Sequence, residues 1–353
     1  MTEISATELA LSVRFNRPIQ NGPLTLFAVM RNEIYILPAF LAHYRALGIE
    51  QFVIVDDASD DGTSEYLAAQ PDCSSGMSPI RFGMHVTISD PSHTGLSGRA
   101  GPIFKRVVPD HYLRGQHVLI ADADEFLLLP PSLPRVPDVV ALMQQRGWKS
   151  VAASLIDFYP ETLEELGDPA APADVSELFT RFGFFDAVPF ITLTPGQQPA
   201  KTGETASERL FRLCGIRNVP PAFSFLPRWL NARLPWGVPS AAWFKTPIIL
   251  YDGATFMVAS HAANVPPPPE IMLAMAHFKF TGDTYAKIQT AIRLKAHARK
   301  GQKYAHYEEM LRVMEQRRLG FHGPHSARYT APSQLIAAGL MTLPEQGPGG
   351  AET

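Results

Sequence analysis

Two aspartates at the end of an apolar run are the residues of this sequence best suited to do chemistry. Asp122 and Asp124 follow the apolar residues 118–120 within HVLIADADEF. Residues two apart on a strand point the same way, so a strand ending here would deliver both carboxylates side by side. Such a pair is unfavourable without a cation between the charges, and Mg²⁺ and Mn²⁺ prefer oxygen ligands. The pair is therefore a candidate metal-diphosphate site, supported by its place at the end of an apolar strand; the alternative is two helix-capping or solvated loop aspartates.

Polar residues also follow two earlier apolar runs. Asp56 and Asp57 come after FVIV, and Arg31, Asn32 and Glu33 come after LTLFAVM. A carboxylate there can accept an N–H of a base or hold a ribose hydroxyl, and a basic residue with an amide can contact base or phosphate. The alternatives are a helix-capping loop for the aspartates and a polar turn for residues 31–33.

The elements that must position these residues alternate between strand and helix. We expect strands at 24–30, 52–55, 117–121 and 151–158, and helices at 34–47, 64–69, 103–112 and 137–146. Strands that are apolar on both faces suit a parallel sheet covered by helices. Ligands of such α/β sheets bind at the carboxyl ends of the strands, where the polar residues above would lie.

The rest of the chain is less regular. We expect a loosely ordered start before residue 23 and disorder from residue 343 onward. Between them the pattern predicts a strand at 85–88, a strand pair at 245–251 and 255–260, a short aromatic segment at 275–280, and a helical zone at 284–319 with a break at Gly301.

Composition limits the function classes. The 353 residues are 46% hydrophobic, enough for a large core, and the net charge of -3 gives no reason to expect a nucleic-acid partner. Cys73 and Cys214 form neither a disulfide framework nor a CxxC zinc site, which indicates a reducing compartment. The start resembles no signal peptide, and no apolar window is long enough to span a membrane. We therefore expect a cytoplasmic protein.

In combination, the motifs resemble glycosyltransferase family 2 and its relative family 92. The resemblance rests on RNE at 31–33, VDD-x-S-x-DGT at 55–63 and DxD-EF at 122–126, in that order, and covers residues 24–130. Weaker matches lie at 151–160, 203–211, 276–280 and 328–341. It implies a GT-A fold, a Rossmann-like mixed sheet flanked by helices in a single large domain. It also implies a nucleotide-sugar donor, Mn²⁺ or Mg²⁺, and a role in polysaccharide biosynthesis.

The resemblance also implies roles for single residues. Asp122 and Asp124 would hold the metal and diphosphate, and Asp56 and Asp57 the nucleoside. His277 resembles the late histidine that completes the metal shell, and His261 is a weaker candidate of that kind; the alternative for His277 is packing in an aromatic cluster. Lys279 would neutralise the departing diphosphate.

The mechanism implied is inversion by direct displacement, with a carboxylate deprotonating the acceptor hydroxyl. The base is predicted to be Glu208, with Glu204 and Asp157 as further candidates. Alternatively, Glu208 pairs with Arg209 or Arg212, and Asp157 only orients the acceptor. The acceptor-loop pattern of the family, usually two glycines followed by paired arginines, is altered here to GETASER at 203–209.

The expected donor is a UDP- or GDP-sugar, and the acceptor a glycan, a lipid-linked or another hydroxyl compound. The basic segment 293–303 fits peripheral contact with the inner face of a membrane, although a solvated helix face explains it better. The alternative functions are a nucleotidyltransferase-like enzyme and an inactive sugar-nucleotide-binding relative. The expected division is a lead-in (1–22), a nucleotide-sugar-binding half (23–130), an acceptor-binding half with the C-terminal helices (131–330) and a tail (331–353).

Overall fold

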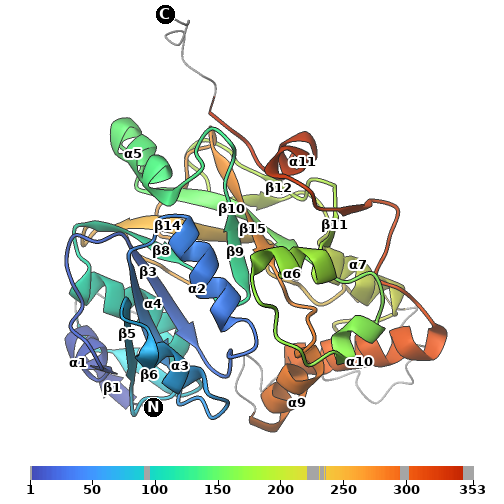
Figure 1. Cartoon of the computed structure of the whole chain (residues 1–353), viewed down its shortest axis with the longest axis horizontal. Helices are drawn as coiled ribbons and strands as arrows, with labels where there is room; N and C mark the ends of the chain where they lie inside the picture. Colours follow the sequence, from blue (N-terminus) through green and yellow to red (C-terminus); the bar gives the residue numbers. More distant parts are fainter. Residues whose placement is uncertain are drawn as a thin grey trace, which may run out of the picture.

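The fold is a mixed α/β arrangement in which one large sheet is flanked by helices, which confirms the predicted fold class. The computed structural model describes residues 2–90, 96–220, 230, 234, 236–294 and 302–344. Figure 1 shows the main sheet across the centre of the molecule. Its nine strands are, in spatial order, β2 (Arg14–Phe15), β5 (Cys73–Met77), β4 (Gln51–Asp56), β3 (Thr25–Met30), β8 (Gln116–Ile120), β14 (Phe244–Tyr251), β10 (Ser150–Asp157), β15 (Met272–His277) and β9 (Glu125–Leu128).

Strand direction brings the polar strand ends together. β3, β4, β5, β8, β10 and β15 all run the same way, whereas β2, β14 and β9 run against their neighbours. The carboxyl ends of the parallel strands therefore lie at the same edge as the first residues of β14 and β9. We call this the carboxyl edge.

The sheet curls at the loop between β8 and β9. Only residues 121–124 separate these strands in sequence, yet three strands lie between them in the sheet. In a flat sheet β8 and β9 would be about 19 Å apart, at about 4.8 Å per strand spacing. Five peptide steps reach about 18 Å only when fully extended. The sheet must therefore bend, and the loop with Asp122 and Asp124 crosses the carboxyl edge.

Alternating side chains supply both faces of the sheet. Along β3, Leu26 and Ala28 face one apolar cluster, while Phe27 faces another. The first cluster is covered by α2 (Leu37–Ala46), α3 (Thr63–Ala69), α5 (Val136–Arg146) and α6 (Val175–Phe182). The second is covered by α1 (Ala6–Leu11) and α4 (Ala100–Tyr112).

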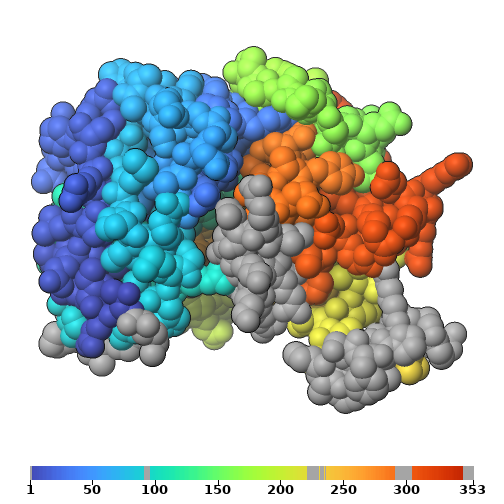
Figure 2. Space-filling model, turned by 90° about the horizontal axis from the view of Figure 1, so that it is seen from below, coloured from blue at the N-terminus to red at the C-terminus, as the bar shows by residue number. Residues whose placement is uncertain are grey.

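A third apolar cluster lies beyond the carboxyl edge. It joins α7 (Ala206–Leu213), α9 (Thr284–Leu294) and α10 (Gln302–Arg317), with the short helix η2 (Glu164–Gly167). Figure 2 shows the N-terminal segments, in blue and cyan, on one side and α9 and α10, in orange and red, on the other. The remaining elements are β1 (Thr2–Ile4), β6 (His85–Ile88), β7 (Ser97–Arg99), β11 (Phe184–Asp186), β12 (Ile191–Thr192), β13 (Ala200–Lys201), β16 (Ser326–Arg328) and α11 (Pro332–Ala337).

The start of the chain is not loosely ordered, contrary to the sequence-based expectation. α1 packs on α4 and buries Leu9 and Ala10, and Val13 is buried beside them. β2 pairs with β5 at Gly76, where a side-chain carbon would lie 2.7 Å from the carbonyl oxygen of Arg14. Burial of this apolar surface holds the segment in place.

The expected strand at 255–260 is also wrong. The segment folds back on itself instead: the Val258 N–H bonds to the Ala262 carbonyl, the Asn264 N–H bonds to the Phe256 carbonyl, and Met257 bridges Ala263. These local hydrogen bonds replace pairing with the neighbouring strand. The predicted helical break at Gly301 and the tail from residue 345 lie outside the described residues.

No helix within the described ranges is long and apolar enough to cross a membrane.

Candidate functional site

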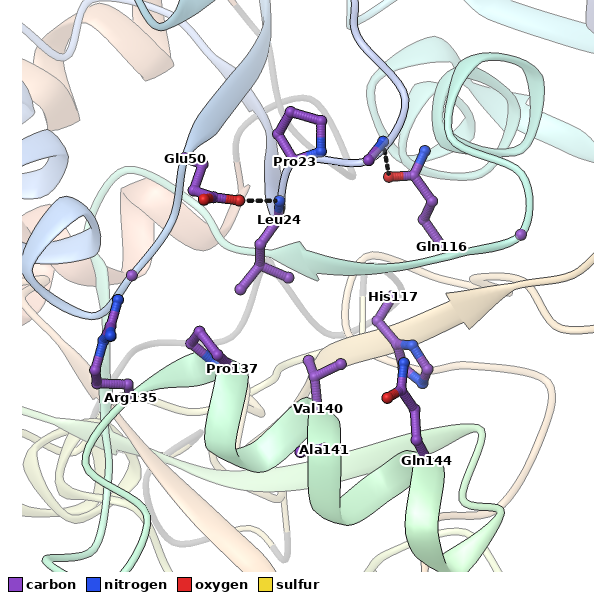
Figure 3. A pocket seen from close by; sticks show the side chains of 13 residues that line it. Pro23, Leu24, Glu50, Gln116, His117, Arg135, Pro137, Val140, Ala141 and Gln144 are labelled. Carbon is purple, nitrogen blue, oxygen red and sulfur yellow. Dashed lines mark hydrogen bonds between the residues drawn. The ribbon is translucent and has the colours of Figure 1, made fainter.

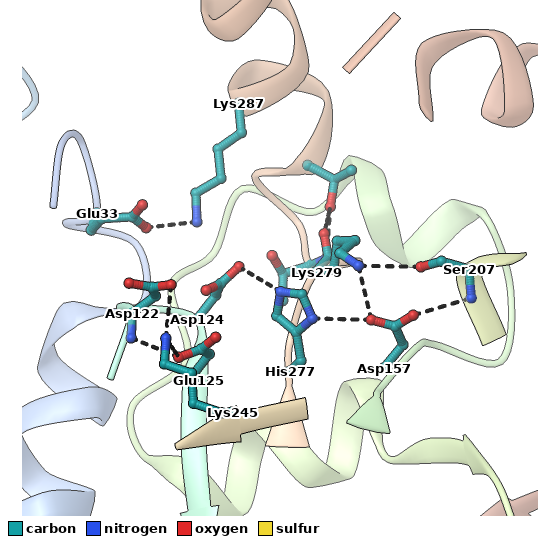
Figure 4. A network of polar contacts seen from close by, with 12 residues as sticks. Glu33, Asp122, Asp124, Glu125, Asp157, Ser207, Lys245, His277, Lys279 and Lys287 are labelled. Atoms are coloured by element: carbon teal, nitrogen blue, oxygen red, sulfur yellow. Dashed lines mark hydrogen bonds and ion pairs between the residues drawn. The ribbon is translucent and has the colours of Figure 1, made fainter. Parts of the chain in front are cut away.

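The carboxyl edge gathers charged side chains from strands that are distant in sequence. Asp122 and Asp124 come from the β8–β9 loop, Asp157 ends β10, His277 ends β15, and Lys245 is the second residue of β14. Figure 4 shows these side chains pointing toward one another. The arrangement follows from strand direction, because each residue lies where its strand meets this edge.

Asp122 and Glu125 are held by two buried lysines. The Lys245 ammonium lies 2.6 Å from Glu125 Oε2 and 3.1 Å from Asp122 Oδ2, and Lys105 of α4 pairs with Asp122 Oδ1. Burial by itself would raise the pKa of Asp122, but the Lys105 and Lys245 charges outweigh it and hold that pKa far below its usual range. Lysines are seldom buried so fully unless they are paired. His261 completes the group: one ligand-type atom each of Asp122, Glu125 and His261 lie within 4.8 Å of one another.

Asp124, His277 and Asp157 form a line. The imidazole Nε2 is 3.2 Å from Asp124 Oδ2, and Nδ1 is 3.0 Å from Asp157 Oδ1. Burial and the Lys279 ammonium would lower the pKa of His277, but the two carboxylates outweigh them and raise it to about 9. The imidazole of the metal-free protein is therefore protonated at neutral pH and donates a hydrogen bond at each end.

Asp157 is an internal anion with no exposed side-chain surface. It accepts hydrogen bonds from His277, from Lys279 Nζ at 2.9 Å and from the Ser207 backbone N–H at 3.1 Å. Burial would raise the pKa of Asp157, but Lys279 and His277 outweigh it and hold the pKa well below its usual range. Lys279 also donates to Ser207 Oγ at 3.2 Å and lies 5.2 Å from the ring centre of Tyr307.

Glu33 lies at the border of this group. Its carboxylate is 2.7 Å from Lys287 Nζ, and that ammonium is 3.1 Å from Asp283, the residue just before α9. Burial raises the pKa of Glu33 to about 7, although the Lys287 charge opposes the shift. Glu33 is thus a carboxyl group that is partly protonated near neutral pH, and its side chain is one-fifth exposed (20%).

The other predicted nucleotide residues form a separate network that joins two loops. Asn32 Nδ2 donates to Asp60 at 2.7 Å, and the Asp60 N–H donates back to Asn32 Oδ1 at 3.0 Å. Asp57 accepts from Arg81 Nε at 2.7 Å and lies 3.6 Å from Arg31. Asp56, the last residue of β4, accepts from the hydroxyls of Ser59 and Ser64. Asp56 thereby shapes the loop that follows it, whereas the N-cap position of α3 is taken by Gly62, which makes no side-chain cap bond.

The acceptor-side carboxylates have partners other than those expected. Glu208 belongs to the capping box of α7 with Thr205, and it accepts from Lys201 and from the Ala241 N–H. Glu204 pairs instead with Arg212 near the surface. Arg209, an alternative partner predicted for Glu208, instead binds Asp186 at 2.7 Å.

The residue types at the carboxyl edge fit a divalent cation. Asp157 is ionised and accepts the His277 Nδ1–H, an arrangement that orients a metal-binding histidine in many proteins. Nε2 then faces Asp124, and loss of its proton frees a nitrogen ligand beside a carboxylate oxygen. With His277 neutral and every carboxyl group ionised, six carboxylates face four ammonium groups, which leaves two negative charges in excess. Partial protonation of Glu33, whose pKa is raised to about 7, lowers this excess toward one near neutral pH. The carboxylates are Glu33, Asp122, Asp124, Glu125, Asp157 and Asp283, and the ammonium groups are Lys105, Lys245, Lys279 and Lys287.

Sequence reasoning missed Lys105, Lys245, Lys287 and Ser207, and it gave Glu125 no role. One signal was present for Lys245, a lysine at the start of the apolar run KTPIILY, where burial of a charge requires a partner. Lys105 and Ser207 carry no such signal, because their partners come from remote parts of the chain.

A cavity of about 460 Å³ lies at the opposite edge of the sheet, beside α5. Figure 3 shows His117 and Gln144 facing each other across it, with Glu50 bonded to the Leu24 N–H. None of the residues predicted for catalysis or metal binding lines this cavity.

Comparisons with known proteins leave the family undecided. No family model matches the chain, and no curated protein matches it. One solved structure, titled "The Crystal Structure of UDP-glucose pyrophosphorylase complexed with UDP-glucose", overlaps 65% of this chain and 77% of its own at 8% identity and a TM-score of 0.25. A second, "UTP-bound UGPase from Acinetobacter baumannii", overlaps 81% and 99% at 8% identity and a TM-score of 0.27. Overlaps this loose carry no argument about function, and the resemblance to the two glycosyltransferase families rests on the motifs.

Proposed function

We propose that this protein is a glycosyltransferase of the GT-A type. It would transfer a sugar from a UDP- or GDP-sugar to a glycan, lipid-linked or other hydroxyl acceptor, with inversion and with the help of Mn²⁺ or Mg²⁺. The observation that carries the proposal is the line Asp157–His277–Asp124 at the carboxyl edge, next to Asp122. Ligands of α/β sheets bind at this edge.

Asp124 and His277 are the groups best placed to hold the metal, and Asp157 is a positioning residue. When bound, a divalent ion would supply positive charge for the departing diphosphate. Asp157 keeps the Nδ1–H of His277 on its own side, so that Nε2 stays directed at Asp124. Lys279, held by Asp157 and Ser207, adds a fixed positive charge to the same edge. Preorganised charges of this kind stabilise negative charge that develops during a reaction.

The proton acceptor for the incoming hydroxyl is best assigned to Glu33. The oxygens of Glu208 and Asp157 accept hydrogen bonds from several donors of the protein and are themselves almost fully buried, which leaves little room for a substrate hydroxyl. Glu33 is more exposed, and a pKa of about 7 is close to the value that suits a general base at neutral pH. Glu33→Gln is expected to lower the rate about 100-fold or more, and Glu208→Gln to lower stability instead.

The proposal is tested by turnover of a panel of UDP- and GDP-sugars with Mn²⁺, followed through release of the nucleoside diphosphate. Asp124→Asn is expected to lower the rate at least about 100-fold, because the metal loses a charged ligand. Asp110→Asn is the matched control: Asp110, near the end of α4, pairs with Arg114 just after that helix, outside the site. Absence of binding and turnover with every donor would refute the proposal. Turnover of a nucleoside triphosphate with a sugar 1-phosphate would favour the nucleotidyltransferase reading.

A further inference from the structure

A metal-like cluster at the carboxyl edge already contains a cation of the protein. Asp122, Glu125 and His261 offer two carboxylate oxygens and one imidazole nitrogen within 4.8 Å, a donor set suited to a divalent transition metal. The backbone positions the third donor, because the Thr246 N–H bonds to the His261 carbonyl at 2.8 Å. His261 is thereby held next to Lys245, one residue earlier on β14.

The Lys245 ammonium lies where a shared cation would bind. It is 2.6 Å from Glu125 and 3.1 Å from Asp122, and the Lys245 side chain has no exposed surface. Lys105 supplies a second buried ammonium to Asp122. Two ammonium groups thus face two carboxylates, so this part of the edge is neutral without a metal.

The ammonium of Lys245 has no ready way to leave. Carboxylates hold it on two sides, and the side chain has no exposed surface through which it could move aside. A divalent ion entering this cluster would have to displace a buried charge that Asp122 and Glu125 already hold. Uncompensated burial of such a charge is strongly unfavourable.

The neighbouring pair Asp124 and His277 offers the opposite conditions. Asp124 and Asp122 each keep 30% of the side chain exposed, but Asp124 faces Nε2 of the His277 imidazole at 3.2 Å, whereas Asp122 faces two ammonium groups. An imidazole nitrogen can itself be a metal ligand, which an ammonium group cannot. A divalent ion can therefore enter at Asp124 and His277 while Lys245 stays in place.

We propose that Lys245 is a built-in cation that fills the Asp122–Glu125–His261 cluster and directs a single divalent ion to Asp124 and His277. The two lysines then present fixed positive charge beside that ion. That these two lysines help to hold a diphosphate rests on the proposed function. That the Lys245 ammonium fills the cluster does not.

The test is titration of the full-length chain with Mn²⁺ alone, by electron paramagnetic resonance and calorimetry. The wild-type chain is expected to bind one ion, with affinity at least about tenfold weaker in His277→Ala and unchanged in His261→Ala. Lys245→Met, similar in length but uncharged, is expected to bind two ions. The double variant Lys245→Met/His261→Ala should return to one.

Three results would overturn the inference. The wild-type chain could bind no ion or two ions. The ion could be lost in His261→Ala and kept in His277→Ala, or a folded Lys245→Met chain could still bind only one ion. Circular dichroism establishes folding, and if Lys245→Met does not fold, the two histidine variants decide the question with Lys245 present. A chain that binds one Mn²⁺ as expected but turns over no nucleotide-sugar would refute the proposed function and leave this inference standing.

Discussion

Replacing Asp157 by asparagine tests the central line of the site. The change keeps the size of the side chain but removes the charge that His277 and Lys279 share. The contacts to His277 Nδ1 at 3.0 Å and Lys279 Nζ at 2.9 Å would no longer be ion pairs, because an amide oxygen accepts a hydrogen bond but carries no charge. Lys279, whose side chain is 13% exposed, would be left with uncharged partners only: the amide oxygen, the Ser207 hydroxyl and the Tyr307 ring.

The expected cost is about 3 to 5 kcal/mol of unfolding free energy, the usual result of removing one partner of a buried ion pair. Urea unfolding at pH 7 measures it. Glu204→Gln is the matched control: it removes the Glu204–Arg212 pair, in which Arg212 is 57% exposed, and should cost less than about 1 kcal/mol.

Two further readouts separate positioning from general damage. The pKa of His277, about 9 in the wild-type chain, should fall when the Asp157 charge is removed, as NMR titration would show. Mn²⁺ affinity should fall about 10- to 100-fold. A variant that loses less than about 1 kcal/mol, like the control, would refute the reasoning that Asp157 is a required internal anion.

Three other outcomes are expected. Burial lowers the pKa of His43 from 6.5 to about 4, so the unfolded chain binds more protons than the folded chain between these pH values, and the folded chain loses about 3 kcal/mol of stability in all as the pH falls from above 6.5. Urea unfolding across this pH range should show a smaller loss of stability in His43→Gln than in the wild-type chain, and an equal loss would contradict the assignment. Phe126 is fully buried, with its ring 5.3 Å from that of Phe278, so Phe126→Ala should lower the unfolding free energy by about 3 to 5 kcal/mol, and a change below about 1 kcal/mol would be inconsistent with that packing. Since His277 has a pKa of about 9, Mn²⁺ binding near pH 7 should release a proton, and the Mn²⁺ affinity should rise about tenfold for each unit by which the pH is raised. Calorimetry in buffers of different ionisation enthalpy measures the proton release, and an affinity that does not depend on pH would exclude His277 as a ligand.

Local pattern predicted the strands that end at the site but not how the sheet is assembled. Apolar runs identified β3, β4, β8 and β10, because strands buried on both faces leave a clear signature. The position of β14 between β8 and β10 depends on pairing between segments about 90 to 135 residues apart in sequence, which no local pattern carries. The ordered start was missed for a related reason, since α1 gains its stability from packing on α4.

The site shows the same division. The grouping of Asp122, Asp124, Asp157 and His277 at one edge follows from strand ends and could be anticipated, whereas their roles stay predictions. Their partners Lys105 and Lys245 are buried, whereas most lysines are exposed, so these two could be recognised only from the folded chain. Glu208 was expected to act as the base or to pair with Arg209 or Arg212, but in the fold it accepts from residues 201 and 241 instead.

The late arrival of β14 has a consequence for the newly made chain on the ribosome. β8 is complete at Ile120, but the strand that covers its free edge begins only at Phe244. At about 5 to 20 residues per second, synthesis of the intervening segment takes about 6 to 25 s. During that time an apolar strand has an unpaired edge open to other chains, a known route to aggregation. Protection of this edge by chaperones, rather than the stability of the finished sheet, would then limit how much protein a cell recovers.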